Sequence, residues 1–85
     1  MPYRILLRPA AIRDLDSLDA KVRGRMERAI DRLRDNPRPP GSKKLVGFEN
    51  EWRLRVGDYR VLYVIDDTAR QVVVARATHR REAYR

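Results

Sequence analysis

The fold is decided by the stretch Trp52-Arg53-Leu54-Arg55-Val56-Gly57-Asp58-Tyr59-Arg60-Val61-Leu62-Tyr63. Apolar and basic side chains alternate in its first half, and this period of two is typical of a strand with one buried face. Gly57-Asp58 separates the two halves and is a turn signal. The stretch therefore predicts a β-hairpin with strands over residues 52–56 and 59–65.

The pairing within this hairpin follows from the length of its turn. A two-residue turn at Gly57-Asp58 makes Arg55 face Arg60, and Arg53 face Leu62, on one side of the sheet. The other side carries three apolar pairs, namely Val56 with Tyr59, Leu54 with Val61 and Trp52 with Tyr63. We expect helices to cover this apolar side.

The arginines on the other side are candidate functional residues. Two arginines that face each other across a ladder repel, which lowers stability. A bound phosphate would offset this repulsion, so Arg53, Arg55 and Arg60 are candidate phosphate ligands. The alternative is that they form the solvent-exposed side of a one-faced sheet, where charged residues are ordinary.

Upstream of the hairpin, the pattern predicts one strand and then a helical region. Tyr3, Ile5 and Leu7 alternate with Arg4, as expected of a first strand. Pro9 suits a first helical position. Apolar residues then recur at gaps of three and four, which is the period of a helix with one buried side. They are Ile12, Leu15, Leu18, Val22, Met26, Ala29, Ile30 and Leu33.

Asp19 divides this helical region. It suits an N-cap position, so we expect a break near Leu18 and two antiparallel helices. The proline-rich residues 36–41 end the second helix, because proline lacks the amide donor and disfavours helix in the residue before it.

The rest of the chain completes the sheet. Residues 43–47 form a basic loop or a short edge segment that carries Lys43 and Lys44. Residues 66–69 read as a turn, residues 71–77 as a third strand of the meander, and residues 78–85 as a polar and basic tail. The predicted order is β-α-α-β-β-β. Residues 1–85 therefore form a single α+β domain, with the helices packed on one face of a mainly antiparallel sheet.

Composition excludes several classes of function. The chain has 85 residues, a net charge of +8, no cysteine and one histidine. It therefore lacks thiol nucleophiles and the ligands of an ordinary zinc site, and we expect neither a metal nor another cofactor. The longest apolar run, residues 61–65, is far too short to span a membrane. We expect a soluble protein of the cytoplasm.

The basic charge is carried mainly by arginine, since three of the 20 basic residues are lysine. Arginine binds phosphate and carboxylate through two parallel donors. Four arginines gather toward the end of the chain: Arg76, Arg80, Arg81 and Arg85. Such a cluster would attract RNA or DNA, and equally an acidic protein segment.

Three rings have alternative roles. Trp52 shares the side of Leu54 and Val56, which indicates a place in the core, although an exposed Trp can stack on a base. Tyr84 lies in the polar tail, where it either serves a phosphate as proton donor or stacking surface, or fixes the tail onto the body. His79 either takes part in proton transfer or is a surface residue.

Two segments together resemble a known family. They are the hairpin core G-D-Y-R-x-x-Y at residues 57–63 and the ending H-R-x-E-x-Y at residues 79–84. With the order of elements, they make the chain similar to the RelE-like toxins. These belong to the RelE/ParE superfamily of bacterial and archaeal type II toxin–antitoxin systems.

The resemblance implies a ribosome-dependent endoribonuclease that cleaves messenger RNA in the ribosomal A site and thereby inhibits translation. No metal takes part: the 2′-hydroxyl attacks the adjacent phosphate and leaves a 2′,3′-cyclic end. Carried over by motif, Arg60 is the central phosphate ligand, Arg80 a second cation, and Tyr84 the residue that orients or stacks the substrate. Arg53 and Arg55 complete the catalytic set, and further RNA contacts are expected from Lys43, Lys44, His79, Arg81 and Arg85.

One departure from the family bears on this activity. Arg53 and Arg55 stand where well-studied members carry two lysines, and arginine does not act as a proton acceptor. The general base is therefore not identified: the nearby candidates are Tyr84 and His79, unless catalysis rests on electrostatics and geometry with the ribosome assisting. Two alternatives remain: a ParE-like toxin that inhibits DNA gyrase by binding, and a catalytically weak toxin that acts through antitoxin binding and co-repression of the operon.

The resemblance also implies partners. They are the ribosome with its messenger RNA, and an antitoxin whose acidic or amphipathic segment wraps the domain and masks the basic side. Operator DNA would be reached only through that antitoxin.

Overall fold

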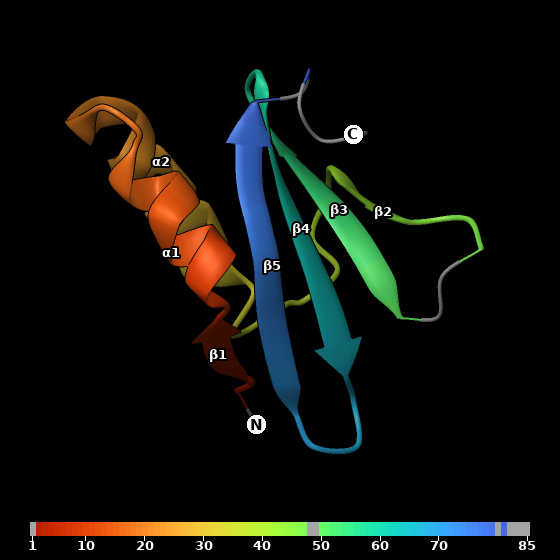
Figure 1. The fold of residues 1–85 in the computed structure, drawn as a ribbon. Coiled ribbons are helices and arrows are strands. Elements are labelled where there is room, and N and C mark those ends of the chain that lie inside the picture. Colours follow the sequence, from red (N-terminus) through yellow and green to blue (C-terminus); the bar gives the residue numbers. More distant parts are fainter. Residues whose placement is uncertain (1, 48–49, 80, 82–85) are drawn as a thin grey trace.

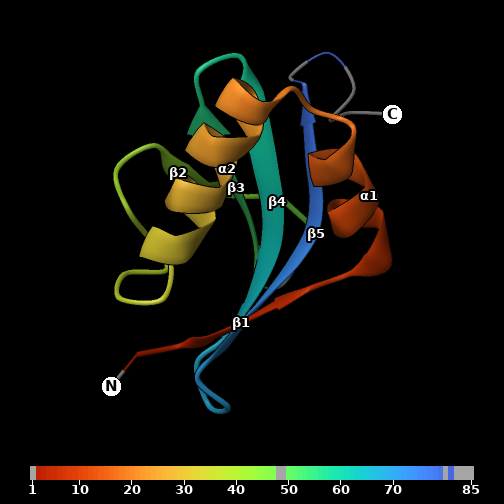
Figure 2. The ribbon, with the colours of Figure 1, turned by 90° about the vertical axis from the view of Figure 1, so that its left-hand side faces the viewer.

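The computed structural model of the 85-residue chain describes residues 2–47, 50–79 and 81. Within them, five strands form one mixed sheet in the order β1-β5-β4-β3-β2. Two helices cover one of its faces (Figures 1 and 2). The elements in chain order are β1 (Arg4–Leu7), α1 (Pro9–Asp16), α2 (Ala20–Arg32), β2 (Ser42–Lys44), β3 (Glu51–Val56), β4 (Tyr59–Asp66) and β5 (Gln71–His79). The predicted α+β class is confirmed.

The helical region divides as predicted. Pro9 is the first residue of α1, and Asp19 is the N-cap of α2. The Asp19 side chain accepts a hydrogen bond of 3.0 Å from the backbone N–H of Val22, which satisfies one of the free donors at the start of a helix. The two helices lie side by side and run in opposite directions (Figure 2). Neither helix in the described part of the chain is long and apolar enough to cross a membrane.

The β3–β4 hairpin has the predicted register. Arg55 pairs with Arg60, Leu54 pairs with Val61, and the pair of Val56 and Tyr59 closes the two-residue turn Gly57-Asp58. Gly57 has a φ of +60°, a left-handed conformation that glycine adopts without the steric cost of a side chain. Each side chain of the paired hairpin residues therefore lies on the side of the sheet that the sequence predicts.

The two edges of the sheet add to the predicted fold. β1 pairs with β5 in parallel, with Ile5 opposite Val72, so the sheet is mixed. Residues 42–44 form the short edge strand β2 beside β3, which confirms the second of the two interpretations of this basic segment. Parallel strands need a long connection, and here the helices and the β2–β4 meander lie between β1 and β5.

Strand β5 differs from the expectation in its length and its regularity. It runs to His79, so Thr78 and His79 belong to the sheet and not to a tail. Leu62 pairs with Arg76, whereas Tyr63 pairs with Val74. Ala75 is therefore the extra residue of a β-bulge, which shifts the register of the last residues of β5 relative to β4.

The core lies between the helices and the sheet. Tyr63 at 1% exposure is its largest fully buried side chain, and its hydroxyl donates a 2.7 Å hydrogen bond to the carbonyl of Pro37. Burial raises the pKa of Tyr63 to about 12. This contact ties the proline-rich loop to the centre of the sheet. The remaining buried apolar residues are Ala11, Leu15, Met26, Ala29, Ile30, Leu33, Leu54, Val61, Ile65, Val72, Val74 and Ala77.

Two carboxylates connect distant parts of the chain. Asp14 of α1 accepts hydrogen bonds from the Arg76 guanidinium at 2.8 and 3.0 Å and from the backbone N–H of Ala77 at 2.9 Å. Asp67, in the β4–β5 turn, accepts from the Tyr3 hydroxyl at 2.6 Å and from Arg38 at 2.8 Å. The first carboxylate fixes α1 to β5, and the second joins the N-terminus, the proline-rich loop and the turn.

Candidate functional site

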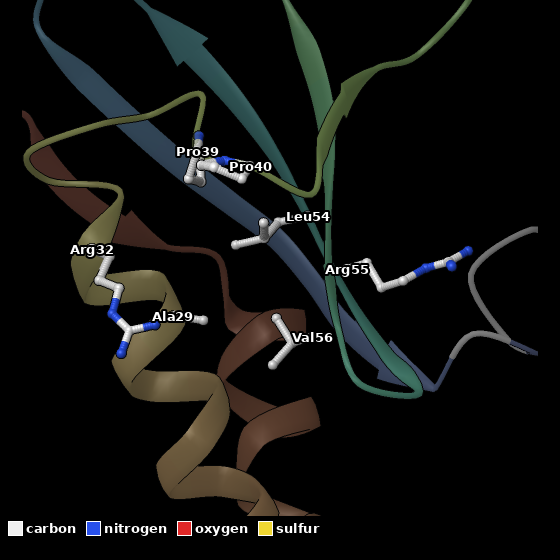
Figure 3. A pocket seen from close by; sticks show the side chains of 7 residues that line it. All are labelled: Ala29, Arg32, Pro39, Pro40, Leu54, Arg55 and Val56. Carbon is white, nitrogen blue, oxygen red and sulfur yellow. The ribbon is translucent and has the colours of Figure 1, made fainter.

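The side of the sheet opposite the helices is called the open face here. Residues that alternate with the core residues along β3, β4 and β5 point to it. Figure 3 shows this alternation at β3: the Arg55 side chain points away from Leu54 and Val56, which lie toward the helices with Ala29. The predicted basic side of the hairpin is therefore the open face.

One row of the open face crosses three strands. Arg55 of β3 is opposite Arg60 of β4, and Arg60 is opposite Thr78 of β5. Directly opposite residues of antiparallel strands point to the same side, so these three side chains form a row. Arg60 is 8% exposed and Thr78 is 5% exposed. They are the two buried polar residues in the described part of the chain, and they are register partners.

A second row lies beside the first. Lys43 of β2 is opposite Arg53 of β3, and Arg53 is opposite Leu62 of β4. The register places Lys44 opposite Trp52, so Lys44 starts from the other side of the β2–β3 ladder. Both lysines nevertheless line one shallow hollow of about 220 Å³ at this edge, with Leu45, Val46 and Arg53.

The two rows form a cationic surface with a buried centre. Arg55 is exposed, Arg53 is half-buried, and Arg60 in the central strand is buried. Guanidinium groups repel one another and attract anions, and a partly buried charge is less screened by salt than an exposed one. The arrangement can therefore bind a phosphate at Arg60 with a second guanidinium beside it on β3.

One arginine of the predicted basic cluster at the end of the chain, Arg76, binds a carboxylate of α1. Arg76 is held by both oxygens of Asp14. Although burial raises the pKa of Asp14, the hydrogen bonds from Arg76 and the Ala77 amide outweigh it, and this pKa is below its ordinary value. Arg76 thus anchors α1 to β5. Arg81 is exposed just beyond β5.

Three of the predicted site residues, Arg80, Tyr84 and Arg85, lie outside the described residues. Their roles stay predictions.

His79 lies at the end of β5 opposite Tyr59. The two rings meet edge to face with centroids 5.2 Å apart, and Nδ1 of His79 accepts a 3.3 Å hydrogen bond from the backbone N–H of Arg81. Because His79 follows Thr78 along the strand, it starts from the side of the sheet opposite the row of Arg60. Its contact with RNA stays a prediction.

Trp52 packs against the core, as its parity predicts. The Arg38 guanidinium lies 5.2 Å from the centroid of its ring, at a distance typical of a cation–π contact. The base-stacking interpretation of Trp52 therefore loses its main support, which was an exposed ring.

A second hollow lies on the helix side of β3. It measures about 160 Å³ and is lined by Ala29, Arg32, Pro39, Pro40, Leu54, Arg55 and Val56 (Figure 3). It is separate from the open face, because the Arg55 side chain points away from it. No group of three or more His, Cys, Asp or Glu residues that could hold a metal occurs among the described residues.

Thr78 is the residue of this site that the sequence pattern missed. The sequence pattern ends the third strand at Ala77 and so places Thr78 in the tail. Two facts were needed to find it: the extension of β5 to His79 and the bulge at Ala75, which sets the pairing with Arg60. The threonine side chain, which favours strands, was the available signal for the longer strand.

Comparisons with known proteins identify the family to which the chain belongs. The sequence model of one family, described as the ParE toxin of the type II toxin–antitoxin system parDE, matches residues 5–84. The chain is 33% identical over 85 residues to the toxin RelE of Mycobacterium tuberculosis, with 99% of this chain and 88% of that protein covered.

Solved structures with the same fold include two toxin–antitoxin complexes. One is RelBE2 from Mycobacterium tuberculosis, with a TM-score of 0.82, 30% identity, and coverage of 93% of this chain and 99% of the other. The other is the archaeal RelE–RelB complex from Pyrococcus horikoshii, with a TM-score of 0.84, 27% identity, and coverage of 98% and 100%. The chain therefore belongs to the RelE/ParE family of toxins from type II toxin–antitoxin systems.

Proposed function

We propose that this toxin is a ribosome-dependent endoribonuclease that cuts messenger RNA in the ribosomal A site. The observation that carries the proposal is the buried Arg60 in the centre of a cationic open face, with Arg55 opposite it on β3. Membership of a family that includes RelE toxins supports it. A strand pair that tolerates this repulsion is suited to holding an anion.

The proposed reaction needs no metal. The 2′-oxygen attacks the adjacent phosphorus, its proton leaves to an acceptor, and the bond from phosphorus to the 5′-oxygen breaks as that oxygen gains a proton. Negative charge grows on the phosphate oxygens in the transition state, and fixed cations stabilise it. Arg60 would bind these oxygens, Arg53 and Arg55 would add positive charge, and Arg80 would be a second cation. Tyr84 would orient or stack the substrate.

The proposed reaction also needs a group that accepts the proton of the 2′-hydroxyl. Arginine donates hydrogen bonds and carries charge but does not accept the 2′ proton. On this proposal the open face contributes electrostatic stabilisation and positioning, which are large terms in phosphoryl chemistry. Arg53 and Arg55 would thus neutralise the charge of the phosphate, as paired lysines do, but would not accept a proton.

The same face would be regulated by an antitoxin. Related toxins have been crystallised with RelB antitoxins. A net charge of +8 favours a partner with an acidic or amphipathic segment. We propose that such a segment masks the open face in the cytoplasm, and that the toxin reaches operator DNA only through it.

The test is primer extension on a translated message, with the purified toxin and programmed ribosomes. The proposal predicts discrete cuts at A-site codons with ribosomes and none on the naked message. Uncut message on ribosomes, from a toxin that arrests growth, would overturn it.

The second candidate is inhibition of DNA gyrase by binding, and it is favoured by the ParE description of the matching family model. A gyrase supercoiling assay separates the two functions. Loss of supercoiling at toxin concentrations that leave messenger RNA intact would assign the protein to the gyrase inhibitors.

A further inference from the structure

We propose that the Thr78 hydroxyl is a direct ligand of the phosphate bound at Arg60, to which it donates a hydrogen bond. The inference rests on the proposed function, because it names a further substrate-contacting residue of the same site. With Thr78, strand β5 contributes a ligand to the open face in addition to those of the β3–β4 hairpin.

The first observation is the position of Thr78. It is the register partner of Arg60 and points to the open face with it. It is 5% exposed, and it lies in a row with two guanidinium groups, those of Arg55 and Arg60. A phosphate seated on this row would meet donors from β3, β4 and β5.

The second observation is an unsatisfied polar atom. The Thr78 Oγ1 is buried and has no hydrogen-bond partner among the described residues. Buried hydroxyls are nearly always paired, and an exception needs an explanation. A valine at this position would have the same shape, would suit a strand equally well and would leave no polar atom unpaired. The hydroxyl therefore has no visible role in stability.

The third argument concerns the chemistry of the missing partner. Guanidinium groups only donate hydrogen bonds, so a ligand between them must supply acceptors. Phosphate oxygens are such acceptors, and the Thr78 O–H bonded to one of them would be a short, charge-assisted hydrogen bond. Hydroxyl side chains commonly contact phosphates in this way. Because Oγ1 is covered, the phosphate reaches it when the Thr78 side chain rotates about χ1.

The test separates the hydroxyl from the methyl group. Thr78→Val removes the hydroxyl at nearly constant shape, and Thr78→Ser retains it. Thr68 is exposed in the β4–β5 turn, so Thr68→Val is a matched control. The probe is inorganic phosphate, titrated into ¹⁵N-labelled toxin while the amide resonances of Arg60 and Thr78 are followed.

Thr78→Val is expected to weaken phosphate binding about tenfold, as the loss of one hydrogen bond to a charged group predicts. Thr78→Ser and Thr68→Val should bind as the wild type does. The melting temperature of Thr78→Val should equal or exceed that of the wild type, since no folded-state hydrogen bond is lost. Equal phosphate affinity in Thr78→Val, or a lower melting temperature together with the weaker affinity, would overturn the inference.

Ribosomal cleavage then distinguishes this inference from the proposed function. If the wild type cuts, Thr78→Val should lower cleavage about tenfold with Thr78→Ser close to wild type. If the wild type does not cut but phosphate binding still depends on the Thr78 hydroxyl, the endoribonuclease proposal fails and the anion site stands.

Discussion

Arg55 and Arg60 face each other across β3 and β4, and this pair is the residue-scale feature on which the account rests. Like charges that face each other in a ladder lower stability. The toxin therefore gives up some stability at the place where the proposed function needs positive charge.

The repulsion between Arg55 and Arg60 predicts that removing one of the two charges stabilises the fold. Arg55→Thr removes an exposed guanidinium and puts a strand-favouring residue in its place. We expect the free energy of unfolding to rise by about 0.5 kcal/mol at low salt. The gain should shrink in about 1 M NaCl, where the repulsion is screened. Urea denaturation at the two salt concentrations measures it, and a loss of stability at both would contradict the repulsion.

The pair itself was predictable from the sequence, but its surroundings were not. Alternation and a two-residue turn are local signals, and they fix which residues face each other within the hairpin. Arg60 pairs with Thr78 of β5, and the register of this pair is set by the bulge at Ala75. A bulge shifts by one residue which side chains of β5 lie opposite those of β4, and it has no characteristic sequence pattern. The sequence therefore did not reveal Thr78 as a neighbour of Arg60.

At the scale of elements, Asp14 connects α1 to the end of β5. Beyond Val74 strand β5 is no longer paired with β1. There the Asp14 carboxylate accepts from the Ala77 N–H and from Arg76. The Asp14 side chain thus accepts a hydrogen bond from a backbone N–H at the strand edge, which would otherwise lack a partner from the sheet.

Replacing this carboxylate should separate α1 from the sheet. Asp14→Ala leaves the Ala77 N–H and the Arg76 guanidinium without this acceptor, which we expect to cost about 2 kcal/mol of unfolding free energy. Asp16→Ala in the same helix is the control, because Asp16 is exposed and makes a longer contact of 3.8 Å to Arg23. Equal stability of the two variants in urea would show that Asp14 is not the anchor.

The ends of the helices were predictable from the sequence, whereas the pairing of β1 was not. The N-cap at Asp19 and the end of α2 before the prolines follow from local chemistry that the sequence states directly. The pairing of β1 with β5 joins residues that are far apart in the chain, such as Arg4 and Gln71. Alternation predicts that residues 4–7 form a strand, and it contains no information on which edge they pair with or in which direction.

At the scale of the whole molecule, two carboxylates connect segments that are distant in the chain: Asp14 joins α1 to β5, and Asp67 joins Tyr3 and the proline-rich loop to the β4–β5 turn. Hydrogen bonds from Arg38 and then from Tyr3 hold the pKa of Asp67 below its ordinary value of 3.8. The pKa of Asp14 is lowered as well, since its bonds to Arg76 and Ala77 outweigh burial. Both groups bind protons more weakly in the folded state than in the unfolded one.

The sign of the pH dependence follows. A carboxylate whose folded pKa is lowered contributes its full stability above its ordinary pKa, and this contribution is lost as the pH falls through the lowered value. We expect the melting temperature to fall between about pH 5 and about pH 2. In the variant with both Asp14→Asn and Asp67→Asn, the melting temperature should be lower at neutral pH and should change less over this interval. An equally steep fall in that variant would show that other groups cause acid unfolding.

The central claim is that Arg60 on the open face is where the toxin acts on RNA. The most direct measurement compares Arg60→Ala with Arg28→Ala in the ribosomal primer-extension assay, after circular dichroism has shown both to be folded. Arg28 is exposed on α2, so both variants lose one positive charge from different sides of the molecule. We expect the cleavage rate of Arg60→Ala to fall about a hundredfold or more, because a ligand of the transition state is lost, while Arg28→Ala cuts like the wild type. Cleavage by Arg60→Ala at the wild-type rate, or an equal loss in both variants, would contradict it.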